Sequence, residues 1–271
     1  MSNPDSNFRF APPDTRAALV IAHPGHELKV FGWLEVAQPR VFVLTDGSGR
    51  SGRSRLSSTT RILKQAGARP GSIYGRLTDS AGYAAILNQE FDLFIELAKE
   101  LTEAFVNEQI NFVAGDALEG YNPMHDVCRL VTNAAVTLAR QARGHDIPNF
   151  EFSLISPPDV RLEPPPANEI WFRLDETALA RKISMAQGYT ELAGEVMETL
   201  GRTSVEAFSV ERLHLSDPAE DARRFDAEPP FYEHYGEKQV AAGHYTRLLR
   251  YNEHLAPLAG ALRRHTEAAL Q

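Results

Sequence analysis

Two histidines near the start of the chain, His23 and His26, are three positions apart and are separated by Pro24 and Gly25. The six residues before them, 17–22, are all apolar, a pattern that predicts a buried strand ending at a turn. In open α/β sheets the carboxyl ends of the strands border the ligand-binding crevice. Imidazoles in such a place either bind a metal ion or contact a phosphate group.

A third histidine, His125, follows another predicted strand, residues 111–115, and stands at the start of a predicted helix. The first and fourth strands of a Rossmann-type sheet are neighbours across its switch point, so this order would place His125 beside His23 and His26. Three imidazoles around one point make a zinc site that keeps one coordination position for water. The sequence therefore predicts that His23, His26 and His125 bind Zn²⁺.

The elements that must position these residues alternate along the chain. Strands are predicted at residues 17–22, 41–45, 72–77, 111–115 and 150–155, and helices at 28–35, 57–65, 83–107 and 124–142. Two more helices are predicted at 175–200 and 238–268, with an aromatic, loop-like stretch at 228–236. This alternation predicts an α/β fold, a Rossmann-like and mostly parallel sheet with helices on both faces and a largely helical C-terminal extension.

Proline-rich stretches at 156–159 and 164–167 are typical of a boundary. We therefore expect a Rossmann-like, metal-binding catalytic core at residues 1–155 and a mostly helical C-terminal part at 156–271 that completes the domain. The chain has one cysteine, Cys128, which excludes an internal disulfide and fits a reducing compartment. We expect Cys128 to be a small buried helix residue rather than a metal ligand.

The composition argues against some classes of binding partner. The net charge is −8, which argues against a general nucleic-acid-binding surface. No stretch approaches the ~20 apolar residues that a transmembrane helix needs, and the first ten residues lack the pattern of a secretory signal. We expect a cytoplasmic protein that acts on a small molecule, and a homo-oligomer is left open.

Residues 22–27, Ala-His-Pro-Gly-His-Glu, resemble the Ala-His-Pro-Asp-Asp-Glu motif of the PIG-L/LmbE-type zinc N-deacetylases. Asn122-Pro-Met-His125 resembles the second motif of that family, His-Pro-Asp-His, and the resemblance covers roughly the first 155 residues. It implies that His23, His26 and His125 hold the metal and that Arg55 contacts the substrate. It also implies removal of an N-acyl group, with N-acetyl the first expectation, from an amino sugar or glycoconjugate.

Two departures from the family pattern bear on the chemistry. Gly25 stands where the family has an aspartate as general base, and Asn122 stands where a histidine helps to polarise the scissile carbonyl. An asparagine amide can still donate a hydrogen bond to an oxyanion. Three neutral ligands leave the full charge of zinc acting on a bound water, whose pKa can fall to about 7 without a carboxylate. The other remedy is a relocated base, and Asp46 and Asp116, which end strands on the same rim, are the candidates.

Two other functions remain open. His23-Pro-Gly-His26 also matches the His-x-Gly-His motif of nucleotidyltransferases, and residues 56–61 loosely resemble their Ser-Ser-Thr-x-x-Arg loop, although only a zinc site gives His125 a role. Such an enzyme would act on a nucleoside triphosphate. The missing aspartate also fits a catalytically lapsed relative that binds a ligand in the same cleft. The glycine- and arginine-rich loop at 47–55 is either a solvated loop or a mobile lid that binds anions.

Overall fold

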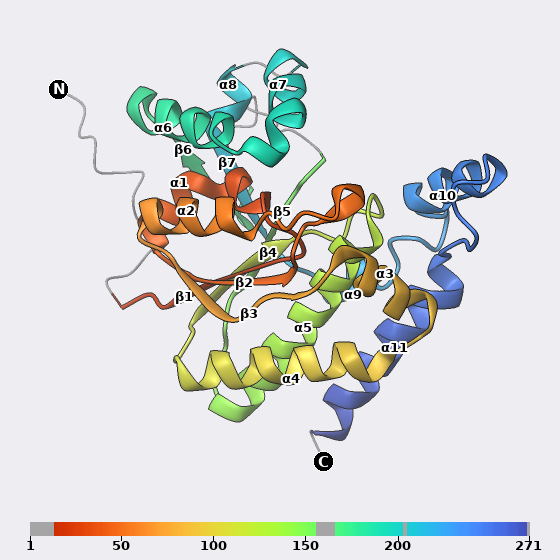
Figure 1. Cartoon of the computed structure of the whole chain (residues 1–271). Coiled ribbons are helices and arrows are strands. Elements are labelled where there is room, and N and C mark those ends of the chain that lie inside the picture. Colours follow the sequence, from red (N-terminus) through yellow and green to blue (C-terminus); the bar gives the residue numbers. More distant parts are fainter. Residues whose placement is uncertain (1–13, 156–165, 203–204, 270–271) are drawn as a thin grey trace.

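The computed structural model describes residues 14–155, 166–202 and 205–269 (Figure 1). At its centre is a seven-stranded sheet with the strand order β3-β2-β1-β4-β5-β7-β6. The strands are Ala17–Ile21 (β1), Arg40–Thr45 (β2), Arg69–Leu77 (β3), Phe112–Asp116 (β4), Asn149–Phe152 (β5), Glu169–Arg173 (β6) and Val210–Leu215 (β7). Strands β1 to β5 pair in parallel, whereas β7 is antiparallel to both β5 and β6. The predicted α/β class with a mostly parallel sheet is confirmed.

Helices cover both faces of this sheet (Figure 1). Successive side chains of a strand point to opposite faces, so strands that are buried on both sides read as continuous apolar runs. One face packs against α4 (Phe91–Asn107), α5 (Pro123–Arg143) and α11 (Ala256–Ala268), and the other packs against α1 (Phe31–Ala37), α2 (Leu56–Ala66) and the segment that contains α6 (Glu176–Gln187) and α7 (Ala193–Arg202).

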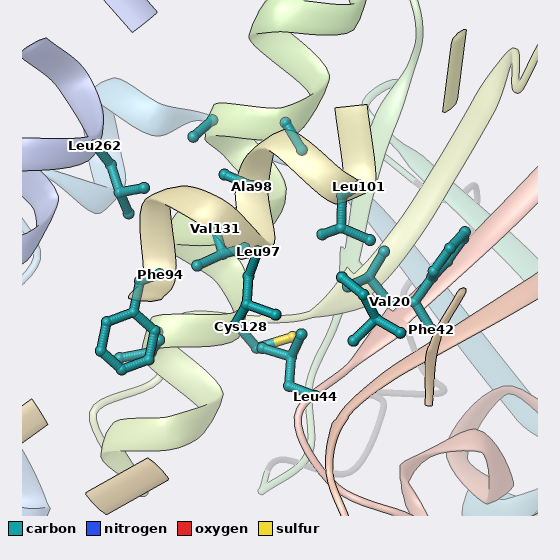
Figure 2. Packing of buried hydrophobic residues seen from close by; sticks show 14 of the residues in the cluster. Val20, Phe42, Leu44, Phe94, Leu97, Ala98, Leu101, Cys128, Val131 and Leu262 are labelled. Atoms are coloured by element: carbon teal, nitrogen blue, oxygen red, sulfur yellow. The ribbon is translucent and has the colours of Figure 1, made fainter. Parts of the chain in front are cut away.

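The first of these two cores includes the single cysteine. Figure 2 shows Val20 and Leu44 of the sheet beside Leu97 of α4 and Cys128 of α5. Cys128 is a free thiol that is completely buried among apolar side chains. Burial raises the pKa of this thiol well above its usual value, which keeps it protonated. Cys128 is therefore a packing residue, as predicted.

Several predicted helix limits were wrong. The helix expected at 83–107 is two helices, α3 (Asp79–Leu87) and α4, because the chain turns at Gln89, whose φ is 56°. The helix expected at 175–200 stops at Gln187 and continues, after a 3-10 turn at Thr190–Leu192 (η4), as α7. The spacing of apolar residues in these segments does not indicate where the helices are interrupted.

The helix limits in the C-terminal segment also differ from those predicted. The loop expected at 228–236 is the start of α10 (Phe231–Ala241), which Pro230 precedes. Gly243, with a φ of 75°, follows its end, so the helix expected at 238–268 is interrupted. It resumes at a π-helical turn, Tyr251–Leu255 (η5), that leads into α11. The remaining elements are His26–Val30 (η2), Gly49–Ser51 (η3), Val205–Phe208 (α8) and Pro218–Asp221 (α9).

The part of the chain after residue 155 contributes strands as well as helices, because β6 and β7 extend the same sheet. The proline-rich stretch at 156–159 and the first half of the stretch at 164–167 lie outside the described residues. Among the described helices, none combines the length and the apolar character that crossing a bilayer requires.

Candidate active site

The three predicted histidines lie together at the carboxyl ends of β1 and β4. These strands are parallel neighbours, with Val20 opposite Gly115, as the sequence predicted. The ring centroids are 5.4 Å apart for His23 and His26, 5.2 Å for His23 and His125, and 4.5 Å for His26 and His125. Segments far apart in the sequence therefore form one imidazole cluster, which we call the histidine cluster.

Two rings of the histidine cluster are fixed by polar contacts of their Nδ1 atoms. His23 Nδ1 lies 2.7 Å from Thr45 Oγ1 and 3.0 Å from Asp79 Oδ1. His26 Nδ1 lies 2.9 Å from Asp116 Oδ2, which also accepts a hydrogen bond from the Ala22 N–H at 2.7 Å. This network assigns the proton of each ring to Nδ1 and leaves the lone pair of each Nε2 available.

Two nitrogen atoms of the histidine cluster lack partners. His23 Nε2 and His125 Nδ1 are buried and have no hydrogen-bond partner among the described residues. Burial lowers the pKa of His23, and burial together with the charges of His26 and His23 lowers that of His125 well below its ordinary value. Both rings are therefore neutral near pH 7, and buried unpaired nitrogen atoms carry a free-energy cost unless something binds them.

The donor set is chemically suited to zinc, although its geometry is not that of a bound ion. Histidine ligands of zinc usually donate their other ring N–H to a carboxylate or carbonyl, which is the arrangement of His23 and His26. Within the described part of the chain, however, no three histidine, cysteine or carboxylate side chains are arranged so that they could hold a metal ion as they stand. The rings pack edge to face, so coordination would require them to rotate toward a common point.

Gly25 lies in the turn between the first two histidines, and its surroundings leave little room for a side chain. Its φ is +110°, a value that L-residues rarely adopt. A Cβ atom at this position would lie 2.5 Å from Leu192 Cδ1, and Tyr189 lies just beyond. The Gly25 N–H donates to the buried carboxylate of Glu27, which also accepts from Thr59 Oγ1. The backbone and the neighbours of position 25, where the resembling motif has an aspartate, therefore favour glycine.

The two carboxylates predicted as relocated bases occupy different environments. Asp116 is completely buried behind His26, where its bonds to His26 and Ala22 make it a group that positions this ring. Asp46 is only partly buried, at the end of β2, and its Oδ1 accepts from the Ser48 N–H at 3.0 Å. The role of Asp46 as a base stays a prediction.

Asn122 and Arg55 lie near the histidine cluster. Asn122 is the N-cap of α5, and its Oδ1 accepts from the Met124 N–H at 2.8 Å and from the Tyr83 hydroxyl at 2.9 Å. These bonds fix the amide and leave its NH₂ group as a donor. Arg55 precedes α2, donates to the Gly47 carbonyl and lines the same cavity as His26 and His125.

Asp79, which is buried at the start of α3, was not among the site residues predicted from the sequence. Its carboxylate accepts from His23, Thr45 and the Gly49 N–H, the last at 2.7 Å. Burial alone would raise the pKa of Asp79, but the hydrogen bond and charge of His23 lower it, so the group is ionised. Asp79 follows the end of β3, and the strand-end rule that identified the histidines could have identified it too.

Other residues of the competing motifs serve the packing around this turn. Ser58 Oγ donates to Glu191 at 2.7 Å, and Thr59 donates to Glu27 at 2.8 Å and lies 3.0 Å from the Tyr189 hydroxyl. Arg61 donates to the Gly188 carbonyl. The stretch 56–61, which resembles the nucleotidyltransferase loop, thus ties α2 to the segment between α6 and α7.

A cavity of about 520 Å³ opens beside the histidine cluster, with His26 and His125 in its wall. Its lining is mostly apolar and comes from the turn after β1, from the end of β5 and from the segment between β6 and β7. Cavities of this size are typical of sites for small organic ligands. Among the described residues of its wall, Arg55 is present whereas Asp46 and Asn122 are not.

No protein family model matches the chain, and no curated protein matches it in sequence. Solved structures do resemble it. The conserved protein TT1542 from Thermus thermophilus matches with a TM-score of 0.51 and 16% identity over 75% of this chain and 95% of that protein. The A40926 pseudoaglycone deacetylase has a TM-score of 0.49 at 18% identity, over 74% of this chain and 96% of that chain. A zinc-inhibited form of a teicoplanin deacetylase has a TM-score of 0.48 at 11% identity, over 75% and 100% of the two chains.

The likeness to the Thermus protein defines a class of fold. The match to the Thermus protein shows that this chain shares its α/β architecture over three quarters of its length. At 16% identity the likeness extends to the fold alone. What the chain does must be argued from its own site.

Proposed function

We propose that this chain is a zinc-dependent amide hydrolase that removes an N-acyl group from an amino sugar or glycoconjugate. The observation that carries the proposal is the histidine cluster. Two of its buried ring nitrogen atoms have no partner among the described residues, while carboxylates hold the opposite sides of His23 and His26. The resemblance of residues 22–27 and 122–125 to the two motifs of the PIG-L/LmbE-type deacetylases supports the same chemistry.

His23, His26 and His125 would hold the ion, and Asp79 and Asp116 would keep the first two rings oriented. Zinc supplies a Lewis acid that polarises a carbonyl and makes water acidic. Asn122, whose Oδ1 accepts hydrogen bonds and whose NH₂ group remains a donor, would donate to the oxygen that becomes negatively charged.

No carboxylate at position 25 takes part in this scheme, because glycine stands there. Asp46 remains the candidate for a proton acceptor at the rim, since Asp116 is enclosed behind His26. Arg55, in the wall of the cavity, would orient an anionic or hydroxyl-rich substrate.

The test is an elemental analysis of the purified protein together with hydrolysis of N-acetylated amino sugars. We expect one zinc per chain and release of acetate, and we expect His125→Ala to lose both. His145→Ala, at an exposed histidine outside the site, is the matched control and should keep both. Full zinc occupancy in His125→Ala would refute the site. Release of pyrophosphate from a nucleoside triphosphate by the zinc-free protein would support nucleotidyl transfer instead, and zinc binding without hydrolysis would support a ligand-binding relative.

A further inference from the structure

The cavity beside the histidine cluster is much larger than an acetyl group requires. An acetyl group has three non-hydrogen atoms and takes up roughly the volume of three water molecules, about 90 Å³ at ~30 Å³ each. The cavity measures about 520 Å³. Its size therefore fits a substrate group of many more atoms next to the reacting amide.

The wall of this cavity is apolar on several sides. Its aliphatic and aromatic side chains come from η2, β5, η4, α6, α7, α8 and β7, and among them are Leu28, Phe152, Leu154, Ile183, Leu192 and Val196. Leu192 reaches the histidine turn itself, because its Cδ1 lies 2.5 Å from the place of a Cβ at Gly25. The apolar surface therefore begins next to the histidine cluster.

Charged residues of the wall are mostly paired within the protein. Lys182 Nζ lies 2.8 Å from Glu211 Oε1, and this buried carboxylate also accepts from the N–H groups of Gly32 and Trp33. Arg212 is paired in the same way with Glu169 at 2.9 Å. Paired charges have little capacity to bind a polar ligand. Apart from the part of the wall that contains Arg55, burial of apolar surface is therefore the main interaction that the wall offers.

Several polar and aromatic residues lie in the wall or at the opening of the cavity. His214, also in the wall, is bonded to Glu151 at 2.6 Å. Lys29 and Glu195 are exposed and therefore lie where the cavity meets solvent. Tyr121 is 49% exposed and stacks on Phe231 with the ring centroids 5.3 Å apart, beside Asn122. A sugar ring has its polar groups satisfied at such a rim, whereas a hydrocarbon chain is stabilised inside.

The cavity wall is mostly apolar, whereas exposed charged residues lie where the cavity meets solvent. From this contrast we infer that the cavity holds the acyl chain of the substrate, and that the amide cleaved by this protein carries a medium-chain fatty acyl group rather than acetyl. The inference rests on the proposed amide hydrolysis and names its substrate class. Water adds across the C–N bond, so the products are a free medium-chain carboxylic acid and the amine. The segment between β6 and β7 then determines specificity, because it supplies much of the wall.

The first experiment compares N-acetyl, N-butanoyl, N-hexanoyl and N-octanoyl glucosamine as substrates of the zinc-loaded protein. Each methylene that enters the cavity should raise kcat/KM about fourfold until the cavity is full. A kcat/KM that is highest for the acetyl substrate, or that does not change with chain length, would overturn the inference while the proposed function stands.

The second experiment fills the cavity. Ala186 of α6 lies in the wall, whereas Ala180 of the same helix is exposed and does not. Ala186→Phe should reduce kcat/KM for the octanoyl substrate at least tenfold more than it reduces kcat/KM for the acetyl substrate. Ala180→Phe should change neither. Equal loss for both substrates in Ala186→Phe would overturn the inference, and the wild-type series decides the question if this variant does not fold.

A binding measurement separates failure of the inference from failure of the proposed function. Titration calorimetry with hexanoate and octanoate needs no turnover, and the two additional methylenes should tighten binding about fifteenfold. Chain-length-dependent binding without hydrolysis of any amide would overturn the proposed function and keep the ligand class. Absence of binding by octanoate, together with hydrolysis of acetyl substrates, would overturn the acyl-chain cavity alone.

Discussion

Replacement of Gly25 by aspartate tests whether residues 22–27 differ from the motif that they resemble only in a side chain or also in the surrounding architecture. The substitution restores the residue of the Ala-His-Pro-Asp-Asp-Glu motif that residues 22–27 resemble. If only the side chain were missing, Gly25→Asp would raise hydrolysis. We expect the reverse, since the backbone and the neighbours of this glycine oppose a side chain.

Two contributions set the magnitude. A φ of +110° with a ψ of −23° lies outside the regions open to L-residues, and a side chain held there costs about 2 kcal/mol. The Cβ atom would meet Leu192 Cδ1 at 2.5 Å, so the buried leucine must leave its rotamer, which costs about 1 kcal/mol more. The total of about 3 kcal/mol corresponds to a melting temperature roughly 6–12 °C lower.

The assay is thermal and urea-induced unfolding, with Gly52→Asp as the matched control. Gly52 also has a positive φ, +65°, but a Cβ atom there would meet no atom of the described residues within 4 Å. This control should lose only about 1 kcal/mol. In a background of Leu192→Ala, the cost of Gly25→Asp should fall by about 1 kcal/mol, because the two positions are in contact. A Gly25→Asp protein that is as stable as Gly52→Asp and hydrolyses its substrate at least tenfold faster would refute the reasoning.

Three further predictions concern buried charged groups. Asp116→Asn removes the carboxylate that holds His26 Nδ1, so zinc affinity in a chelator competition should fall about 10–100-fold, and an unchanged affinity would contradict this role. Glu211→Ala leaves the buried Lys182 ammonium without its partner, so the free energy of unfolding in urea should fall by about 3–5 kcal/mol; a loss below about 1 kcal/mol would contradict the pairing. Burial raises the pKa of Asp221 to about 6. The native state then binds more protons than the unfolded chain between about pH 4 and 6, so this group should lower stability as the pH rises through that range, and urea titrations of Asp221→Asn should lack that contribution.

The sequence was sufficient to predict the centre of the fold and to bring the three histidines together. Apolar runs that end in polar residues identify parallel strands, and the order of such strands in a doubly wound sheet makes β1 and β4 neighbours. His23 and His125 could therefore be placed side by side without knowledge of any side-chain contact. The helix interruptions could not be placed, because a positive φ at Gln89 leaves no trace in the spacing of apolar residues.

Contacts between distant segments could not be predicted from the sequence, for a different reason. The bond between His23 and Asp79 joins residues 56 positions apart, and Asp79 stands among other polar residues that could equally be helix caps. The contact between Gly25 and Leu192 joins the first strand to a segment whose entry into the active site depends on β6 and β7 joining the sheet. Apolar spacing describes neither contact, because each depends on packing between elements.

The absence of an aspartate at position 25 and the presence of an apolar cavity have one structural origin. Leu192 belongs to the segment between β6 and β7 that builds the cavity wall, and the same side chain fills the space beside Gly25. A carboxylate there would face hydrocarbon on one side and would be costly to ionise. Under the proposed function, a site that excludes this carboxylate must obtain its nucleophile from an ion held by neutral ligands. His26, which replaces the second aspartate of the motif, makes all three expected ligands neutral. Under the proposed function and the inferred acyl substrate, Gly25, His26 and Leu192 are consistent parts of one arrangement.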